Sequence, residues 1–304
     1  MLLAAFIFIA SLVGLLLASD WFVDSSERIG LSLGISPFVI GVTIVAFGTS
    51  LPELASSVVA VLNNEAAIVT GNVIGSNVAN VCLVLGVVAV VAGGIKMEFK
   101  VLDIDVPILL VSAIMTWTVT RDGLISAPEG LVLLVLLVLF LVNSFRSHGR
   151  EDGVRVAAGW RAYGLLLVGA LGVYFGAKYM VYGIQELSTE LGLSSGAIAM
   201  SAVALGTSLP EVIVSVAAAR KGKPGIAVGN VLGSNVFNSY AVLGIPSLIG
   251  ELSVPIEEIS FSLYFMLAIT VLFCFLATAQ NVSRWEGATL IALYGVFMLE
   301  LFVA

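Results

Sequence analysis

The sequence predicts an all-α polytopic membrane protein, with about ten transmembrane helices arranged as two inverted five-helix repeats and with both termini outside the cell (N-out, C-out). Three observations predict this fold class: the composition, the distribution of basic residues among the loops, and a sequence repeat. Of the 304 residues, 60% are hydrophobic and only 11% are charged. A soluble domain of this length needs far more charged surface, so most of this surface must face lipid.

Apolar runs of roughly 20 residues recur along the chain, and each is long enough to cross a hydrocarbon core of about 30 Å. The first run lacks a basic leading segment and has no small-residue cleavage site before Asp20, which indicates a retained helix rather than a signal peptide. The predicted spans are 1–19, 36–62, 70–94, 104–119, 127–145, 160–182, 193–219, 225–249, 259–279 and 285–303.

Basic residues concentrate in every second loop between these spans. If the N-terminus is outside, the odd-numbered loops face the cytoplasm and hold 11 of the 13 lysines and arginines. In short loops such a bias sets the orientation in the membrane, with the basic loops inside. The sequence therefore predicts that the basic 144–161 loop is cytoplasmic and that both termini are outside.

The two halves of the chain repeat each other at one fixed offset. Residues 41–62 align with 199–220, and residues 71–86 align with 229–244, both without a gap and both 158 positions apart. An odd number of spans in each half gives the halves opposite orientations, which is the inverted repeat of many secondary transporters. A channel or an intramembrane enzyme could share this layout. The predicted units are a first repeat at 1–145, a cytoplasmic linker at 146–158 and a second, inverted repeat at 159–304.

Two glutamates occupy equivalent positions of the repeat, each inside an apolar span. Glu53 and Glu211 follow the same GTSLP segment, with no lysine or arginine close by in sequence. An unpaired carboxylate at this depth costs at least about a few kcal/mol, so such groups are protonated, paired or bound to a cation. A neutral glutamic acid bonded to a neighbouring helix is the alternative for one copy, but two equivalent copies favour a cation site.

A glycine and a proline bracket the two residues before each glutamate. Gly48 and Pro52 do so in the first copy, and Gly206 and Pro210 in the second. Proline removes a hydrogen bond and clashes with the carbonyl four residues earlier, which predicts loosened carbonyls around residues 46–49. Loosened backbone at membrane depth is tolerated where it is buried or lines a polar cavity. A simple packing kink is the alternative interpretation.

The second repeated motif predicts a helix with a polar stripe. Every fourth residue of GNVIGSNVAN and GNVLGSNVFN is polar, and the glycines are also four apart, which allows close helix packing. Amides are costly in lipid, so this stripe indicates a polar path, whereas Asn77 and Asn235 are expected on another face. The stripe residues are Asn72, Ser76 and Asn80 in the first copy and Asn230, Ser234 and Asn238 in the second.

All of these candidate ligands are oxygens. The absence of thiolate or imidazole ligands argues against zinc, copper and iron. Two carboxylates with neutral oxygens suit Ca²⁺, which takes 6–8 oxygen ligands, better than Mg²⁺, which demands a tight octahedron. The same oxygens can hold Na⁺, and the glutamates can also bind protons. One site that accepts either a dication or monovalent ions is the physical basis of exchange.

With GTSLPE present twice, and with GNVIGSN and GNVLGSN, the sequence resembles the calcium/cation antiporter superfamily, and specifically the prokaryotic sodium/calcium exchangers. The resemblance extends over essentially the whole chain. It implies that helices two, three, seven and eight form the site and that helices one and six slide to alternate access. It implies Ca²⁺ held by Glu53 and Glu211 with the carbonyls of Thr49 and Thr207. The Na⁺ ligands that it implies are Ser50, Ser76, Asn80, Ala204, Ser208, Ser234 and Asn238.

One position departs from some exchangers of this family, which have aspartate where this chain has Asn238. Both Asn80 and Asn238 are amides here, which leaves the stoichiometry open and, to a lesser degree, the coupling ion. The GNxxE-type motif of the proton/calcium exchangers is absent, so sodium is favoured over protons. A proton/calcium exchanger and a potassium-dependent sodium/calcium exchanger are the alternatives.

The alternative from another class is a passive cation channel, but an inverted repeat with two buried carboxylates favours a carrier. The chain has no HExxH or GxSxG motif, so we expect no enzyme activity. Asp20 and Lys178 are equivalent in the repeat. We interpret them as side chains that reach the membrane interface; the alternative is that they bind partners that change between transport states.

Cysteine, histidine and net charge limit the kinds of cofactor and partner that the chain can have. Cys82, Cys274 and the single His148 form no metal motif, so we expect no cofactor, with Ca²⁺ and Na⁺ as cargo. The net charge of −7 argues against nucleic acid as a partner. We therefore expect small inorganic cations and the lipid bilayer as partners, a multi-pass location in a prokaryotic cell (inner) membrane, and a monomer as the simplest oligomeric state.

Overall fold

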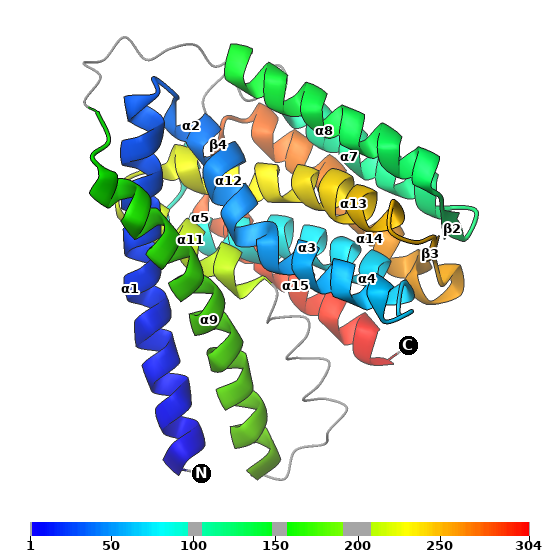
Figure 1. The fold of residues 1–304 in the computed structure, drawn as a ribbon, viewed down its shortest axis with the longest axis horizontal. Coiled ribbons are helices and arrows are strands. Elements are labelled where there is room, and N and C mark those ends of the chain that lie inside the picture. Colours follow the sequence, from blue (N-terminus) through cyan, green and yellow to red (C-terminus); the bar gives the residue numbers. More distant parts are fainter. Residues whose placement is uncertain (1, 97–104, 148–156, 191–207, 304) are drawn as a thin grey trace.

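The computed structural model describes residues 2–96, 105–147, 157–190 and 208–303, and it is helical nearly throughout (Figure 1). The first half contains the helices α1 (Leu2–Ser32), α2 (Pro37–Ile40), α3 (Ala46–Leu62), α4 (Ala67–Ala79), α5 (Leu85–Ala92), α7 (Asp105–Thr120) and α8 (Ala127–Ser147). The second half contains α9 (Trp160–Glu190), α11 (Leu209–Arg220), α12 (Pro224–Phe237), α13 (Leu243–Ser247), α14 (Ile256–Thr278) and α15 (Arg284–Val303).

Three wide π-helical turns join some of these helices into longer ones. The turn η1 (Gly41–Val45) joins α2 to α3, η2 (Asn80–Val84) joins α4 to α5, and η3 (Asn238–Val242) joins α12 to α13. Within the described part of the chain, six of the resulting helices are long and apolar enough to cross a membrane. The predicted all-helical, polytopic fold is therefore confirmed.

The predicted spans agree with the structure to within a few residues, with two corrections. The first predicted span ends at residue 19, but α1 continues to Ser32, and the sixth ends at 182, but α9 continues to Glu190. Hydropathy falls where charged residues begin, although these residues remain helical. The beginning of the predicted span 193–219 lies outside the described residues.

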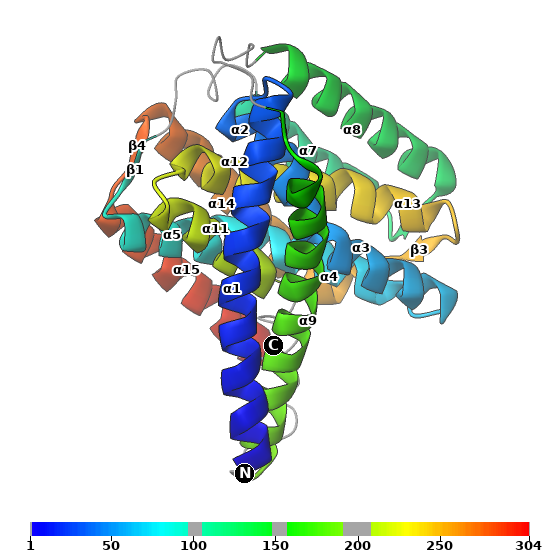
Figure 2. The ribbon, with the colours of Figure 1, turned by 60° about the vertical axis from the view of Figure 1, so that its left-hand side comes forward.

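Four two-residue strands connect the loops of the two halves. Strand β1 (Ile95–Lys96) pairs with β4 (Asn281–Val282), and β2 (Leu124–Ile125) pairs with β3 (Leu252–Ser253). β1 and β4 follow the third and ninth spans, whereas β2 and β3 follow the fourth and eighth, so each pair joins loops of one side. Figure 2 shows β1 with β4 at the end of the body opposite to β3. Since β1 and β3 are repeat equivalents on opposite sides, the two halves are inverted.

The helices α1 and α9 form a pair that projects from the rest of the molecule (Figures 1 and 2). Glycines of α9 face α1 along its length, and a Cβ atom at any of them would meet α1 at 2.6–2.9 Å. Small residues at such a seam let two helices pack closely in lipid. The four glycines are Gly169, Gly172, Gly176 and Gly183.

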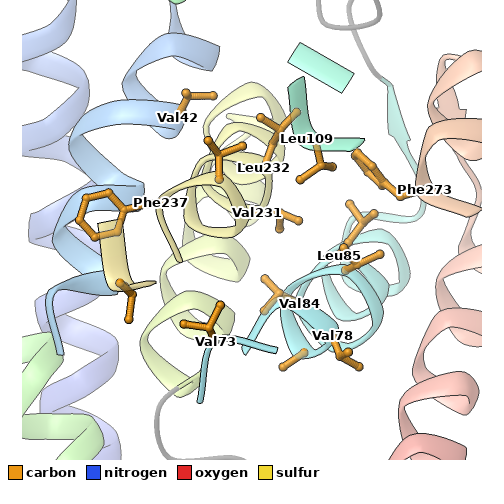
Figure 3. Packing of buried hydrophobic residues seen from close by; sticks show 14 of the residues in the cluster. Val42, Val73, Val78, Val84, Leu85, Leu109, Val231, Leu232, Phe237 and Phe273 are labelled. Carbon is orange, nitrogen blue, oxygen red and sulfur yellow. The ribbon is translucent and has the colours of Figure 1, made fainter. Parts of the chain in front are cut away.

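Helix α12 lies in the centre of the body, and all its residues from Ile226 to Phe237 are buried. Figure 3 shows its residues Val231 and Leu232 among valines and leucines of neighbouring helices. The predicted close packing is confirmed for Gly229 and Gly233, because a Cβ atom at either would collide with the backbone of residues 38–42.

Candidate ion-binding site

The two glutamates of the repeat lie in the interior of the body. Glu53 lies in the middle of α3 and Glu211 in the first turn of α11, and each is 1% exposed. The two carboxylates are close enough to repel each other electrostatically. The Ser50 hydroxyl donates a hydrogen bond to Oε1 of Glu211 at 3.4 Å, so the two copies of the motif meet across the repeat.

Around these glutamates, buried polar atoms without a hydrogen-bond partner are concentrated. An unpaired buried polar atom costs about 1–3 kcal/mol, so such a group of atoms indicates the place of an ion or of water. Among the described residues, these atoms include both carboxylate oxygens of Glu53, Oε2 of Glu211, the hydroxyls of Ser76 and Ser208, Oδ1 of Asn80, and both amide atoms of Asn238. These eight atoms all belong to residues that the sequence predicts for the site, whereas Ser26 Oγ, Asn77 Oδ1 and Ser144 Oγ are unpartnered atoms of other residues.

A pair of equivalent hydrogen bonds holds one amide of each polar stripe. Asn72 Nδ2 donates to Ser57 Oγ at 3.3 Å, and Asn230 Nδ2 donates to Ser215 Oγ at 2.9 Å. Ser57 and Ser215 were missed as site residues by sequence reasoning. They follow Glu53 and Glu211 by four residues, so the helical period could have placed them on the same face.

Asn230 also faces the first half of the chain. Its Oδ1 atom accepts hydrogen bonds from Thr49 Oγ1 at 3.2 Å and from Ser234 Oγ at 3.5 Å. Because Ser215 holds the amide nitrogen, the oxygen of Asn230 points toward these two predicted ligands. The hydrogen bonds of Asn230 thereby link α3, α11 and α12.

Asn77 and Asn235, which are expected on another face than the polar stripe, are buried as well. Their exposed fractions are 4% and 2%, and both bond to the opposite half of the chain. Asn80 Nδ2 donates to Asn235 Oδ1 at 3.2 Å, and Asn77 Nδ2 donates to Ser239 Oγ at 3.0 Å. These two hydrogen bonds cross the repeat boundary in the apolar interior and join the two halves.

The wide turns begin at the predicted amide ligands. Turns η2 and η3 start at Asn80 and Asn238, which are equivalent in the repeat. Such π-helical turns are rare and often lie at functional sites, because they leave backbone groups without their usual helical partners. The sequence does not predict these turns.

The prediction of loosened backbone at residues 46–49 is wrong in its position. Helix α3 is α-helical from Ala46 through Pro52 to Leu62, and the wide turn precedes it, at Gly41–Val45. A proline removes only one donor, and an adjacent wide turn can absorb the distortion. In the second half, Pro210 lies in the first turn of α11, where its missing N–H group costs little.

Of the predicted ligands, the structure describes nine, and all nine are buried: Thr49, Ser50, Glu53, Ser76, Asn80, Ser208, Glu211, Ser234 and Asn238. Ala204 and Thr207, together with Gly206, lie outside the described residues. No cluster of three or more histidine, cysteine, aspartate or glutamate residues occurs in the part of the chain that the structure describes. The candidate ligands that the structure describes are thus two carboxylates with hydroxyl and amide side chains.

Comparison with known proteins identifies the family. The family model described as "Sodium/calcium exchanger protein" matches residues 3–146 and 161–303, which is nearly the whole chain. This chain belongs to the sodium/calcium exchanger family. The family match leaves out residues 147–160, which nearly coincide with the linker predicted at 146–158.

Individual relatives match this chain over nearly their whole length. The sodium/calcium exchanger MaX1 of Methanosarcina acetivorans is 33% identical over 97% of both chains. The inner membrane protein YrbG of Escherichia coli is 30% identical over 94% of this chain and 92% of its own. A structure of the exchanger NCX_Mj soaked with 10 mM Na⁺ and zero Ca²⁺ has a TM-score of 0.88 at 32% identity and covers 99% of both chains. Like these relatives, this chain is a multi-pass membrane protein of the prokaryotic type.

Proposed function

We propose that this chain exchanges Ca²⁺ for Na⁺ by alternating access, at a site between Glu53 and Glu211. The observation that carries the proposal is the meeting of two repeat-equivalent, buried carboxylates, of which three oxygen atoms have no hydrogen-bond partner. Membership of the sodium/calcium exchanger family supports the choice of ions.

The ligand chemistry supports exchange of a dication for monovalent ions. Two carboxylates neutralise one Ca²⁺, and hydroxyl and amide oxygens complete its shell of 6–8 ligands. The same neutral oxygens can hold Na⁺ when Ca²⁺ leaves. An empty pair of buried carboxylates is costly, so the protein changes conformation more readily when loaded. The proposal assigns no catalytic residue and no cofactor, since both ions are cargo.

The neutral ligands also favour Na⁺ over H⁺ as the coupling ion. Protons would need only the carboxylates, whereas the unpartnered atoms include oxygens of Ser76, Ser208, Asn80 and Asn238. Within this proposal the units are the repeats 1–145 and 159–304, joined by a cytoplasmic linker at 146–158, with both termini outside.

Flux measurements in vesicles test the function. Purified protein in vesicles loaded with Na⁺ is diluted into Na⁺-free buffer, and ⁴⁵Ca²⁺ uptake is followed, with a parallel set that has only a pH gradient. We expect uptake driven by Na⁺ and lost in Glu53→Gln and in Glu211→Gln. Uptake driven only by the pH gradient would make the chain a proton/calcium exchanger.

The transport rate distinguishes a passive channel from a carrier. Single-channel current steps, or turnover above about 10⁵ ions per second, would exceed what conformational steps on the μs–ms scale allow and would contradict a carrier. Failure of both gradients to drive uptake would mean that calcium is the wrong cargo.

A further inference from the structure

A cluster of charged residues joins α1 to the turn between α11 and α12, away from the ion-binding site. Three carboxylates of α1 lie at one-turn spacing and therefore on one face of the helix: Asp20, Asp24 and Glu27. Opposite them are the two lysines of the turn, Lys221 and Lys223. The first predicted span ends at residue 19, so most of this cluster belongs to the part of α1 that hydropathy did not include.

Each lysine bridges two carboxylates in a staggered pattern. Lys221 Nζ lies 3.0 Å from Asp20 Oδ1 and 2.9 Å from Asp24 Oδ2, and it also donates to the Asp20 carbonyl at 3.0 Å. Lys223 Nζ lies 3.0 Å from Asp24 Oδ1 and 2.7 Å from Glu27 Oε2. Asp24 is thus shared by both lysines.

The lysines are held in place by the turn itself. Gly222, between them, has a φ of 72°, and its N–H donates to the Ala219 carbonyl at 3.0 Å, while the Lys223 N–H donates to the Ala218 carbonyl at 2.9 Å. These bonds close the C-terminus of α11 with a glycine in the left-handed conformation. The turn is therefore a rigid extension of the helix that carries Glu211.

The ion pairs are partly shielded from water. The lysine side chains are 24% and 18% exposed and Glu27 is 24% exposed, whereas Asp20 and Asp24 are half-exposed. Burial lowers the pKa of Lys223, but its bonds to Glu27 and Asp24 outweigh this effect and raise the pKa overall. Lys223 therefore stays charged near neutral pH, and its ion pairs persist.

Apolar contacts also join α1 to the described part of the body. Phe22 packs where a Cβ atom at Gly48 would lie, and Ile40 packs against Gly30. The pair of α1 and α9 is joined internally by its glycine seam, and it projects from the body as a unit (Figure 2). The ion pairs add charged contacts to these, and their carboxylates recur at one-turn spacing along α1.

We propose that Lys221 and Lys223 are positioning residues for exchange, which form an ion-pair register with Asp20, Asp24 and Glu27 and hold the α1–α9 pair at one position along the body. At the helical rise of about 1.5 Å per residue, Asp20 and Asp24 are about 6 Å apart along the axis, and Asp24 and Glu27 about 4.5 Å. A shift of α1 by about one turn brings each lysine to the next carboxylate, and one of the two lysines then keeps a single carboxylate instead of two. Positions between these two cost both sets of ion pairs, so the register favours discrete steps. The role of these ion pairs in exchange rests on the proposed transport function, whereas their effect on the position of α1 does not.

Distances between spin labels test the register without any ion flux. Labels are attached at Leu16→Cys on α1 and Ile68→Cys on α4, both exposed, in a background with Cys82→Ala and Cys274→Ala. For Lys221→Gln/Lys223→Gln we expect the distance distribution to broaden or shift by about one helical turn, roughly 5 Å. Lys221→Arg/Lys223→Arg should keep the original distribution. Arg220→Gln, a neighbouring exposed cation, is the matched control and should also keep it.

Neutralising the other side of the cluster gives an independent check. Asp20→Asn/Asp24→Asn/Glu27→Gln should reproduce the distances of the lysine variant, and combining the two sets should add nothing, because both remove the same interactions.

In vesicles, each set should change the initial rate of ⁴⁵Ca²⁺ uptake by at least about threefold, the scale expected of a few weak ion pairs. Unchanged distances in both sets, or additive effects, would overturn the register. A wild-type protein that moves no calcium would overturn the proposed function while leaving the distance test intact.

Discussion

At the scale of single residues, the candidate site depends on how buried amides are oriented. Asn230 presents its oxygen to Thr49 and Ser234 because Ser215 holds its nitrogen at 2.9 Å. The equivalent bond between Asn72 and Ser57 shows that the arrangement belongs to the repeat rather than to one half. These serines act through the amides and do not themselves belong to the predicted ligand set.

Replacement of Ser215 by alanine should therefore weaken ion binding. The substitution leaves a buried amide donor unpaired, at a cost of about 1–3 kcal/mol, and frees Asn230 to turn its oxygen away. We expect Ca²⁺ affinity to fall by about fivefold or more, as the lower part of that range implies, when measured by calorimetry on purified protein. The control is Ser56→Ala, since Ser56 is exposed and its hydroxyl donates to the Glu53 carbonyl rather than to an amide side chain. Equal affinities of the two variants would contradict the role of Ser215.

At the scale of elements, close backbone contact sets the position of α12. A Cβ atom at Gly229 would collide with the backbone of residues 38–42. Close backbone contact brings α12, with Asn230, against the helix that carries Glu53. The position of α12 thus determines the geometry of the site.

Gly229→Ala should accordingly destabilise the protein. Its added methyl group collides with the carbonyl of Phe38 and would lie 2.9 Å from the amide nitrogen of Val42, and overpacking of this kind costs about 1–3 kcal/mol. We expect a lower apparent melting temperature in detergent for Gly229→Ala than for Gly295→Ala, the control, because Gly295 is an exposed glycine in the middle of α15. Equal melting temperatures would show that α12 can move away without cost.

At the scale of the whole molecule, the features predicted correctly are those that depend on short stretches of sequence or on the repeat. The helices follow from apolar runs, and the meeting of Glu53 with Glu211 follows from their equivalence in an inverted repeat. The continuation of α1 beyond Asp20 does not follow, because its carboxylates are compensated by lysines about 200 positions away in the chain. The bonds of Asn77 and Asn235 across the halves, and the wide turns at Asn80 and Asn238, likewise depend on tertiary packing that helical periodicity does not express.

The central claim is that two carboxylates, one from each repeat, share one ion, and equilibrium Ca²⁺ binding to purified protein tests it most directly. Removing one member of a buried charged group costs about 3–5 kcal/mol, so Glu53→Gln and Glu211→Gln should each lower Ca²⁺ affinity by roughly 100-fold or more. Glu65→Gln, which removes an exposed carboxylate near the end of α3, should bind as the wild type does. Wild-type affinity in either of the first two variants would contradict a shared site.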